Sequence, residues 1–130
     1  MGRQRTASES VETDEQQVAR RGSAPHSLTD AEVAADVRRL ATLGNDTRYE
    51  ALRVIAEAED GVCVCDLESA LGVSQGAVSQ ALSRLFSAGL VERRKEGRWR
   101  YYTATPSAER LLRVLDTTRD ATNEGDAGNE

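Results

Sequence analysis

The 130-residue chain has only two cysteines, Cys63 and Cys65, and they are one residue apart. Two thiolates at this spacing could hold one soft metal or metalloid ion, because thiolates prefer soft ions to calcium or magnesium. A shared tetrahedral ion with metal–sulfur bonds near 2.3 Å needs its sulfurs about 3.7 Å apart. Residues i and i+2 point about 200° apart on an α-helix but to the same side of an extended segment. A shared ion therefore requires non-helical backbone here or must unwind a helix start. The alternative is two small, buried apolar residues.

The composition predicts one folded domain between polar ends. Hydrophobic residues make up 38% of the chain, enough for one core, and the formal net charge is −5. Residues 1–28 lack apolar periodicity and predict a disordered N-terminal tail, and residues 119–130 predict an acidic disordered C-terminal tail. The folded domain is expected over residues 29–118. Lys95 is the only lysine among 17 basic residues, which is typical of a halophile-like protein or of a GC-rich genome.

Several classes of protein are not favoured by this sequence. No apolar run approaches eighteen residues and no leader is visible, so we expect neither a membrane span nor secretion. Two cysteines one residue apart are not a disulfide framework, which favours the cytoplasm. One histidine, with no nucleophile–base set and no glycine-rich phosphate loop, argues against an enzyme.

Helix caps, glycines and apolar spacing predict the local structure. We expect helices over about 29–43, 46–60, 66–71, 74–88 and 107–118, with a β-hairpin over about 90–103. Thr29 with Glu32 forms a capping-box pattern, Asp66 is expected to cap the third helix, and Gly89 fits a left-handed C-terminal position. A short helix, a tight turn, a longer helix and a hairpin predict a mainly α winged helix-turn-helix.

The helix over 74–88 has one apolar side and one small, polar side. Val78, Leu82, Leu85 and Phe86 are expected to face the core. The opposite side carries Gln80, Ser83 and Arg84, flanked by Ser79, and no acidic residue occurs in the segment. Small groups let a helix enter a major groove, and amide, hydroxyl and guanidinium groups can bond base edges. This side is therefore a candidate DNA-reading surface, although a solvent-facing side is the alternative.

Basic residues continue into the predicted hairpin. Residues 74–103 contain six basic and two acidic residues, whereas residues 29–73 contain four basic and ten acidic ones. With Glu96-Gly97 as the turn, Lys95 would face Arg98 and Arg93 would face Arg100, all four on one face. Like charges opposed across strands are destabilising unless an anion covers them, and a phosphate backbone would do so. Trp99 and Tyr101, on the other face, are expected to pack on the helices.

From about Leu43 to Tyr102 the chain resembles the ArsR-type (ArsR/SmtB) winged-helix repressors. The matching segments are "LGNDTRYEALRVI", "CVCDLESALGVSQGAVSQALSRLFSAGLV" and "RRKEGRWRYY". The resemblance implies a homodimer, built from the first and last helices, that represses an operon and releases double-stranded DNA when an inducer binds. It also puts Gln75, Ser79 and Gln80 on base-reading positions, next to Ser74 as a further candidate contact.

The resemblance also gives the cysteines a role. Cys63 and Cys65 fall on positions that ligate a soft metal or metalloid in the family, and Asp66 matches an oxygen ligand of some zinc-responding relatives. A third thiolate used by some sensors would lie at position 68, which is Glu68 here, and the N-terminal arm offers only His26. The inducers implied are arsenite or antimonite, or a thiophilic divalent ion such as zinc or cadmium, with the third ligand open.

The sequence therefore predicts a DNA-binding repressor that is released when a soft ion binds the cysteine pair. Two alternatives remain. The hairpin could instead meet an acidic protein partner, so that the domain is a protein–protein interaction module, or the repressor could respond to a redox or non-metal signal.

Overall fold

The computed structural model describes the backbone of residues 25–129 and the side chains of residues 25–122. The expected disordered tail over 1–28 lies almost wholly outside these residues. The chain divides into two units, residues 1–41 and 42–130, which are described separately. Helix α3 begins at Asp30 in the first unit and runs to Leu43, two residues beyond the boundary. The predicted capping box is confirmed: the Thr29 N–H donates to Glu32 Oε1 at 2.9 Å, and the Glu32 N–H donates to Thr29 Oγ1 at 3.1 Å.

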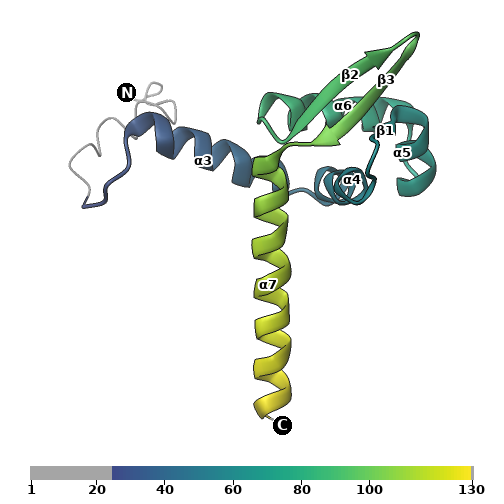
Figure 1. The fold of residues 1–130 in the computed structure, drawn as a ribbon. Coiled ribbons are helices and arrows are strands. Elements are labelled where there is room, and N and C mark those ends of the chain that lie inside the picture. Colours follow the sequence, from purple (N-terminus) through teal and green to yellow (C-terminus); the bar gives the residue numbers. More distant parts are fainter. Residues whose placement is uncertain (1–24, 130) are drawn as a thin grey trace, which may run out of the picture. The chain divides into compact units, whose positions relative to one another are not determined.

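The second unit has the predicted mainly α architecture with a small sheet (Figure 1). Its elements are α4 (Asp46–Glu57), β1 (Val62–Cys63), α5 (Val64–Leu71), α6 (Gln75–Ser87), β2 (Val91–Glu96), β3 (Trp99–Ala104) and α7 (Pro106–Asn129). Helices α4, α5 and α6 pack on one another, and α4 also packs on β3 and α7. The helix-turn-helix and its hairpin therefore share one core.

That core is built from the apolar sides of the helices and the base of the hairpin. The buried side chains with the largest volume are Leu52, Ile55, Leu67, Val78, Leu82, Leu85, Leu90 and Val91. Burial of a side chain of this size stabilises the fold by about 1.5–3 kcal/mol. Because α6 contributes Val78, Leu82 and Leu85, its opposite side is fixed in orientation.

Local hydrogen bonds fix both ends of α6. The Ser74 Oγ accepts from the Ala77 N–H at 3.1 Å at the N-terminus. At the C-terminus Gly89 has a φ of 74°, and the Leu90 N–H donates to the Leu85 carbonyl at 2.9 Å. Leu85 and Leu90 are both fully buried, which gives the hydrophobic contact of a Schellman motif around the predicted left-handed Gly89.

Replacing Gly89 with alanine is expected to destabilise the fold by about 1–2 kcal/mol, because a Cβ at this left-handed φ meets the following carbonyl. No other atom lies within 4 Å of that Cβ, so the backbone conformation is the sole cause. Gly76→Ala is the matched control: it lies within α6, where its Cβ has room, and should stabilise by about 0.5–1 kcal/mol. Urea unfolding measures both. Equal midpoints for Gly89→Ala and the parent would contradict this account.

The sheet is three-stranded and antiparallel, in the order β1-β3-β2. Strand β1 is not among the predicted elements; it pairs Val62 with Tyr102 and Cys63 with Tyr101. The hairpin register also differs from the prediction, because Glu96 pairs with Trp99 and the turn is Gly97-Arg98. Gly97 has a φ of 62°. Tight two-residue hairpin turns favour a positive φ at their first position, which explains the shift of one residue.

Helix α7 is longer than the sequence predicts. It continues to Asn129 rather than ending near residue 118, so the residues expected to form a tail continue the helix. No proline interrupts residues 107–129, and a glycine within a helix costs only about 1 kcal/mol. None of the described helices is both long and apolar enough to span a bilayer.

Candidate nucleic-acid interface and thiol site

The side of α6 that faces away from the core carries the predicted DNA-contact residues. Every one of them is exposed: Ser74, Gln75, Ser79, Gln80, Ser83 and Arg84. The surface they form has hydroxyl, amide and guanidinium groups and no carboxylate. It can donate and accept hydrogen bonds along one continuous strip.

Phe86 does not follow the predicted separation of α6 into an apolar side that faces the core and a polar side that faces away. It is expected in the core, but it is 40% exposed, and the Arg93 guanidinium lies over its ring at 4.1 Å from the centroid. The buried residues of α6 are Val78, Ala81, Leu82 and Leu85, and the C-cap residue Ala88 is also buried. The cation–π contact joins the last turn of α6 to β2.

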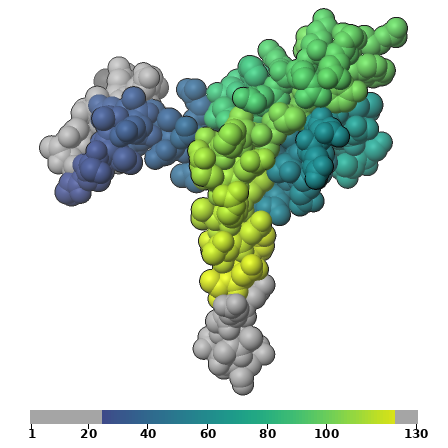
Figure 2. Space-filling view, in the orientation of Figure 1, coloured from purple at the N-terminus to yellow at the C-terminus, as the bar shows by residue number. Residues whose placement is uncertain are grey.

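One face of the hairpin is basic, as predicted, although the pairs differ. Lys95 lies opposite Arg100, whereas Arg93 lies opposite the buried Tyr102. Arg98 is in the turn rather than opposite Lys95. Because the turn lies one residue later than predicted, each residue of β2 pairs with a residue of β3 two positions further along the chain. A change of two positions preserves the facing of side chains, so Arg93, Lys95 and Arg100 still share one face. The base of the hairpin packs on the helices, and its end projects beyond them (Figure 2).

The other face of the hairpin carries Arg94, a cation that is not among the predicted DNA-contact residues. The Arg94 guanidinium lies over the Tyr101 ring at 5.4 Å, donates to Glu96 at 2.9 Å and donates to the Asp60 carbonyl at 3.3 Å. Successive side chains of a strand point to opposite faces, so the sequence alone predicts that Arg94 lies on the face opposite to Arg93. Trp99 is expected to pack on the helices, but it is 53% exposed.

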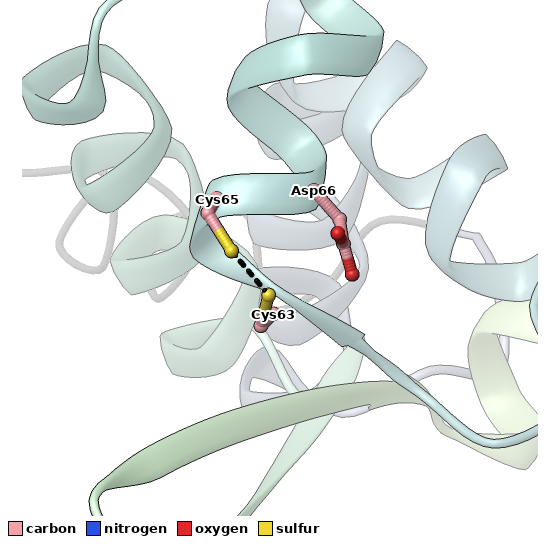
Figure 3. Close-up of side chains that lie close together, drawn as sticks. All are labelled: Cys63, Cys65 and Asp66. Carbon is pink, nitrogen blue, oxygen red and sulfur yellow. Dashed lines mark hydrogen bonds between the residues drawn. The ribbon is translucent and has the colours of Figure 1, made fainter.

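The two cysteines meet where β1 joins α5 (Figure 3). Cys63 has extended backbone, with φ −92° and ψ 167°, whereas Cys65 lies in the first turn of α5. Their Sγ atoms are 2.7 Å apart. Cys63 is 9% exposed and Cys65 is exposed. The sulfurs converge because the chain changes from strand to helix between them, so only one of the two has the non-helical backbone that a shared ion is expected to need.

Asp66 lies beside the thiols. Its carboxylate oxygen and the two sulfurs lie within 4.8 Å of one another, so the three side chains could together ligate an ion. The expected capping role of Asp66 is wrong, because α5 begins at Val64 and Cys63 is its N-cap residue. The carboxylate is in the first turn, where it interacts favourably with the helix dipole. Elsewhere in the described residues, the His26 Nδ1 accepts from the Leu28 N–H, and His26 is not in this set.

The Cys63 thiol holds its proton more firmly than a free cysteine. The hydrogen bond with Cys65 is the main cause of its raised pKa, followed by burial. A thiophilic ion must displace this proton when it binds. The site therefore places a protonated Cys63 thiol beside the Cys65 sulfur and the Asp66 carboxylate.

Known proteins are similar to this chain in both sequence and fold. The family model for the bacterial regulatory proteins of the arsR family matches residues 45–93. A putative arsenical resistance operon repressor, ArsR2 of Halobacterium salinarum, is 62% identical over 95 residues, covering 73% of this chain and 80% of that protein.

A second Halobacterium salinarum protein, a putative arsenical resistance operon repressor ArsR, is 45% identical over 65% of this chain and 66% of its own length. Among solved structures, the homodimeric winged helix-turn-helix DNA-binding domain of Mb0332 from Mycobacterium bovis, a possible ArsR-family regulator, superposes with a TM-score of 0.68 and 28% identity. That match covers 78% of this chain and 94% of the domain. The chain therefore belongs to the ArsR family of winged helix-turn-helix transcriptional regulators and is not an enzyme.

Proposed function

We propose that this chain is a dimeric repressor that leaves its DNA operator when Cys63 and Cys65 bind a soft metalloid or metal ion. The observation that carries the proposal is the position of the thiol pair. It lies at the junction of β1, which pairs with the hairpin strand β3, and α5, which packs on α6. A ligand at this junction can act on both candidate DNA-binding elements at once.

DNA binding would divide between the two elements. The exposed strip of α6, with Gln80 and Arg84 at its centre, suits base edges in a major groove. The basic face of the hairpin, with Lys95 opposite Arg100, suits phosphates, because an anion relieves the repulsion between opposed cations. The Arg93–Phe86 contact holds the two elements together.

The ion would be held by the two thiolates and an oxygen from Asp66. A tetrahedral ion requires sulfurs about 3.7 Å apart, and the two Sγ atoms are in contact in the free protein, so side-chain rotation can bring both onto one ion. Cys65 is exposed, whereas the backbone of Cys63 is held by the β1–β3 ladder. The start of α5 would therefore move more than the strand.

Two routes connect that movement to DNA. A shift of α5 changes the support of α6, against which it packs. A pull on Cys63 acts on Tyr101, its partner in β3, and Tyr101 lies under Arg94, which also binds the Asp60 carbonyl just before β1. Ion binding thus changes the relative position of α6 and the hairpin, which a rigid duplex does not tolerate.

Arsenite is the inducer we favour, since two curated relatives are named as putative arsenical resistance operon repressors. Antimonite, zinc and cadmium are the competing inducers. An oxidant is a second candidate signal, because the two thiols are in contact.

The decisive experiment is binding of the purified chain to a labelled duplex from upstream of its own gene, with each of these agents added in turn. Release by arsenite at low micromolar concentration supports the proposal. Release by an oxidant alone would replace the ion with a redox signal. Absence of salt-dependent binding to any duplex would favour a protein partner instead.

The dimer would use apolar residues that the single chain leaves exposed. On α7, Val114 is 61% exposed, Leu115 is 38% exposed and Leu111 is half-buried, at spacings that put all three on one stripe. On α3, Val37 and Leu40 are exposed. Covering such stripes is the usual reason for association.

We expect Val114→Asp to convert a dimer into a monomer, because it puts a charge at the centre of the α7 stripe. The exposed Arg113→Asp, on another side of α7, is the matched control and should remain dimeric. Sedimentation equilibrium distinguishes them. If both variants remain dimers, the interface lies elsewhere.

A further inference from the structure

A cluster of charged side chains joins α4 to α7, away from the thiol site and the basic face of the hairpin. The Arg53 guanidinium of α4 donates to the Asp116 carboxylate of α7 at 2.9 Å. Asp116 also pairs with Arg119, and Arg119 hydrogen-bonds to the Tyr49 side chain of α4. Arg119, and after it Arg53, lower the pKa of the Asp116 carboxyl, so this group is charged at neutral pH. One carboxylate thus connects two helices through a pair of residues 63 positions apart.

The place of Asp116 along α7 decides what this bridge can do. Ala108 and Leu112 are the buried residues of α7, and Asp116 continues their row at a spacing of four. After Leu112, none of the side chains of α7 that the structure describes is buried. The helix itself continues to Asn129 and extends away from α4 (Figure 1). A helix that is packed only near its beginning can pivot there, so a bridge one turn later limits its tilt.

The tilt of α7 matters because α7 carries the apolar stripe that we assign to the dimer. Helix α4 packs on α6 and, through Arg53, also holds α7. The angle between α4 and α7 therefore fixes where α6 lies relative to the axis of the dimer. The two reading helices of a dimer must meet half-sites one helical turn of DNA apart, about 34–36 Å, or a multiple of it. A change of tilt in each copy changes the separation of the two α6 helices.

We propose that the Arg53–Asp116 bridge determines which spacing of half-sites this protein prefers in its operator. The inference rests on the proposed dimer and its DNA binding, to which it adds two positioning residues that act through α4 and α7. An exposed ion pair shifts an equilibrium by about 1.4- to 5-fold. Because a dimer contains two such bridges, their loss should reduce the preference between spacings by about 2- to 30-fold.

The test compares the operator with duplexes whose half-sites are one base pair closer together or further apart. The parent should bind the native spacing most tightly. Asp116→Asn keeps the shape of the carboxyl group and removes its charge, so the ratio of affinities for native and altered spacing should fall by about 2- to 30-fold. Its affinity for a duplex with a single half-site should equal the parent's, which a general loss of structure would not give. Fluorescence anisotropy measures all of these affinities.

The chain offers a matched control for the bridge. Glu57 also pairs with Arg53, at 3.6 Å, but both residues belong to α4, so this pair does not hold α7. Glu57→Gln should therefore keep the parent's ratio. Arg53→Gln should reproduce the effect of Asp116→Asn, and the double variant should show no further decrease, because each change removes the same bridge.

The outcomes separate this inference from the proposed function. A parental ratio in Asp116→Asn, or an equal decrease in Glu57→Gln, would overturn the inference and leave the proposed function standing. A monomeric Asp116→Asn in sedimentation equilibrium would also overturn it, by placing the residue in the dimer contact. A lower urea midpoint together with weaker binding to a single half-site would overturn it too, because the bridge would then support the fold itself. If the parent binds no duplex, or binds its operator as a monomer, both are overturned.

Discussion

A chain in which both cysteines are replaced by serine is expected to bind its operator like the parent and to remain bound when arsenite is added. Serine keeps the shape of cysteine, but its hydroxyl is a hard ligand that does not hold soft ions. Neither thiol lies on the exposed strip of α6 or the basic face of the hairpin, so both DNA-binding surfaces remain intact. The expected effect is complete: no release at arsenite concentrations that free all of the parent's DNA.

The single variants separate the two thiols. Cys63→Ser removes a ligand that is nearly buried, and its urea midpoint must be compared with the parent's before its DNA binding is interpreted. Cys65→Ser changes an exposed side chain and should fold normally. Ser69→Ala, also exposed on α5, is the control and should be released by arsenite like the parent. If arsenite releases the double variant, the cysteines are structural and the inducer site is elsewhere.

A gain of function tests the same site in the other direction. Residue 68 is one helical turn after Cys65, and residues three apart share a side of a helix. Glu68→Cys would add a third thiolate where the chain has two and would remove one negative charge. We expect arsenite to release this variant at a concentration at least about 10-fold lower, a difference of about 1.4 kcal/mol in ion binding, measured by the same DNA-binding titration. If arsenite releases Glu68→Cys at the same concentrations as the parent, residue 68 does not reach the ion.

Local chemistry explains which parts of the fold can be predicted. The caps at Thr29 and Ser74 and the left-handed Gly89 act through hydrogen bonds to residues within five positions, so the sequence alone contains the information. The apolar side of α6 follows from helical spacing. These features define the helix-turn-helix and hence the orientation of its exposed strip.

Features that depend on distant residues do not follow from the local sequence. β1 has two residues, and its strand character comes from pairing with Tyr101 and Tyr102 in β3. That pairing makes Cys63 extended and the N-cap of α5, which is why Asp66 is not the cap. Phe86 is only partly covered, and the residue that lies over its ring is Arg93 of β2, which is distant from it in the local helical pattern.

The sequence therefore predicts which residues form the thiol site but only part of its backbone geometry. The spacing of Cys63 and Cys65 indicates a shared ion on extended backbone. The structure brings the sulfurs together differently, with one cysteine at the end of a strand and the other in the first turn of a helix. An ion bound at this junction, as we propose, would act on two elements rather than one.

Replacement of Gln80 or Arg84 with alanine is expected to weaken binding to the operator by about 1–3 kcal/mol for each base contact that is removed, roughly 5- to 150-fold. Binding to random duplex should change little for Gln80→Ala, since its amide carries no charge. Both side chains are exposed on α6, so folding should be unaffected. Fluorescence anisotropy with operator and random duplexes measures the ratio. Unchanged ratios for both variants would mean that α6 does not read the sequence.

The hairpin should respond in the opposite way. Lys95→Ala with Arg100→Ala is expected to weaken operator and random duplex alike and to reduce the slope of log affinity against log salt by about one unit for each phosphate that is no longer neutralised. Because Lys95 and Arg100 are directly opposed, removing both relieves repulsion in the free protein. The double variant should therefore be at least as stable in urea as the parent while it binds DNA less well. A decrease in stability together with affinity would mean that these side chains support the hairpin itself, and an unchanged salt slope would mean that they do not contact phosphate.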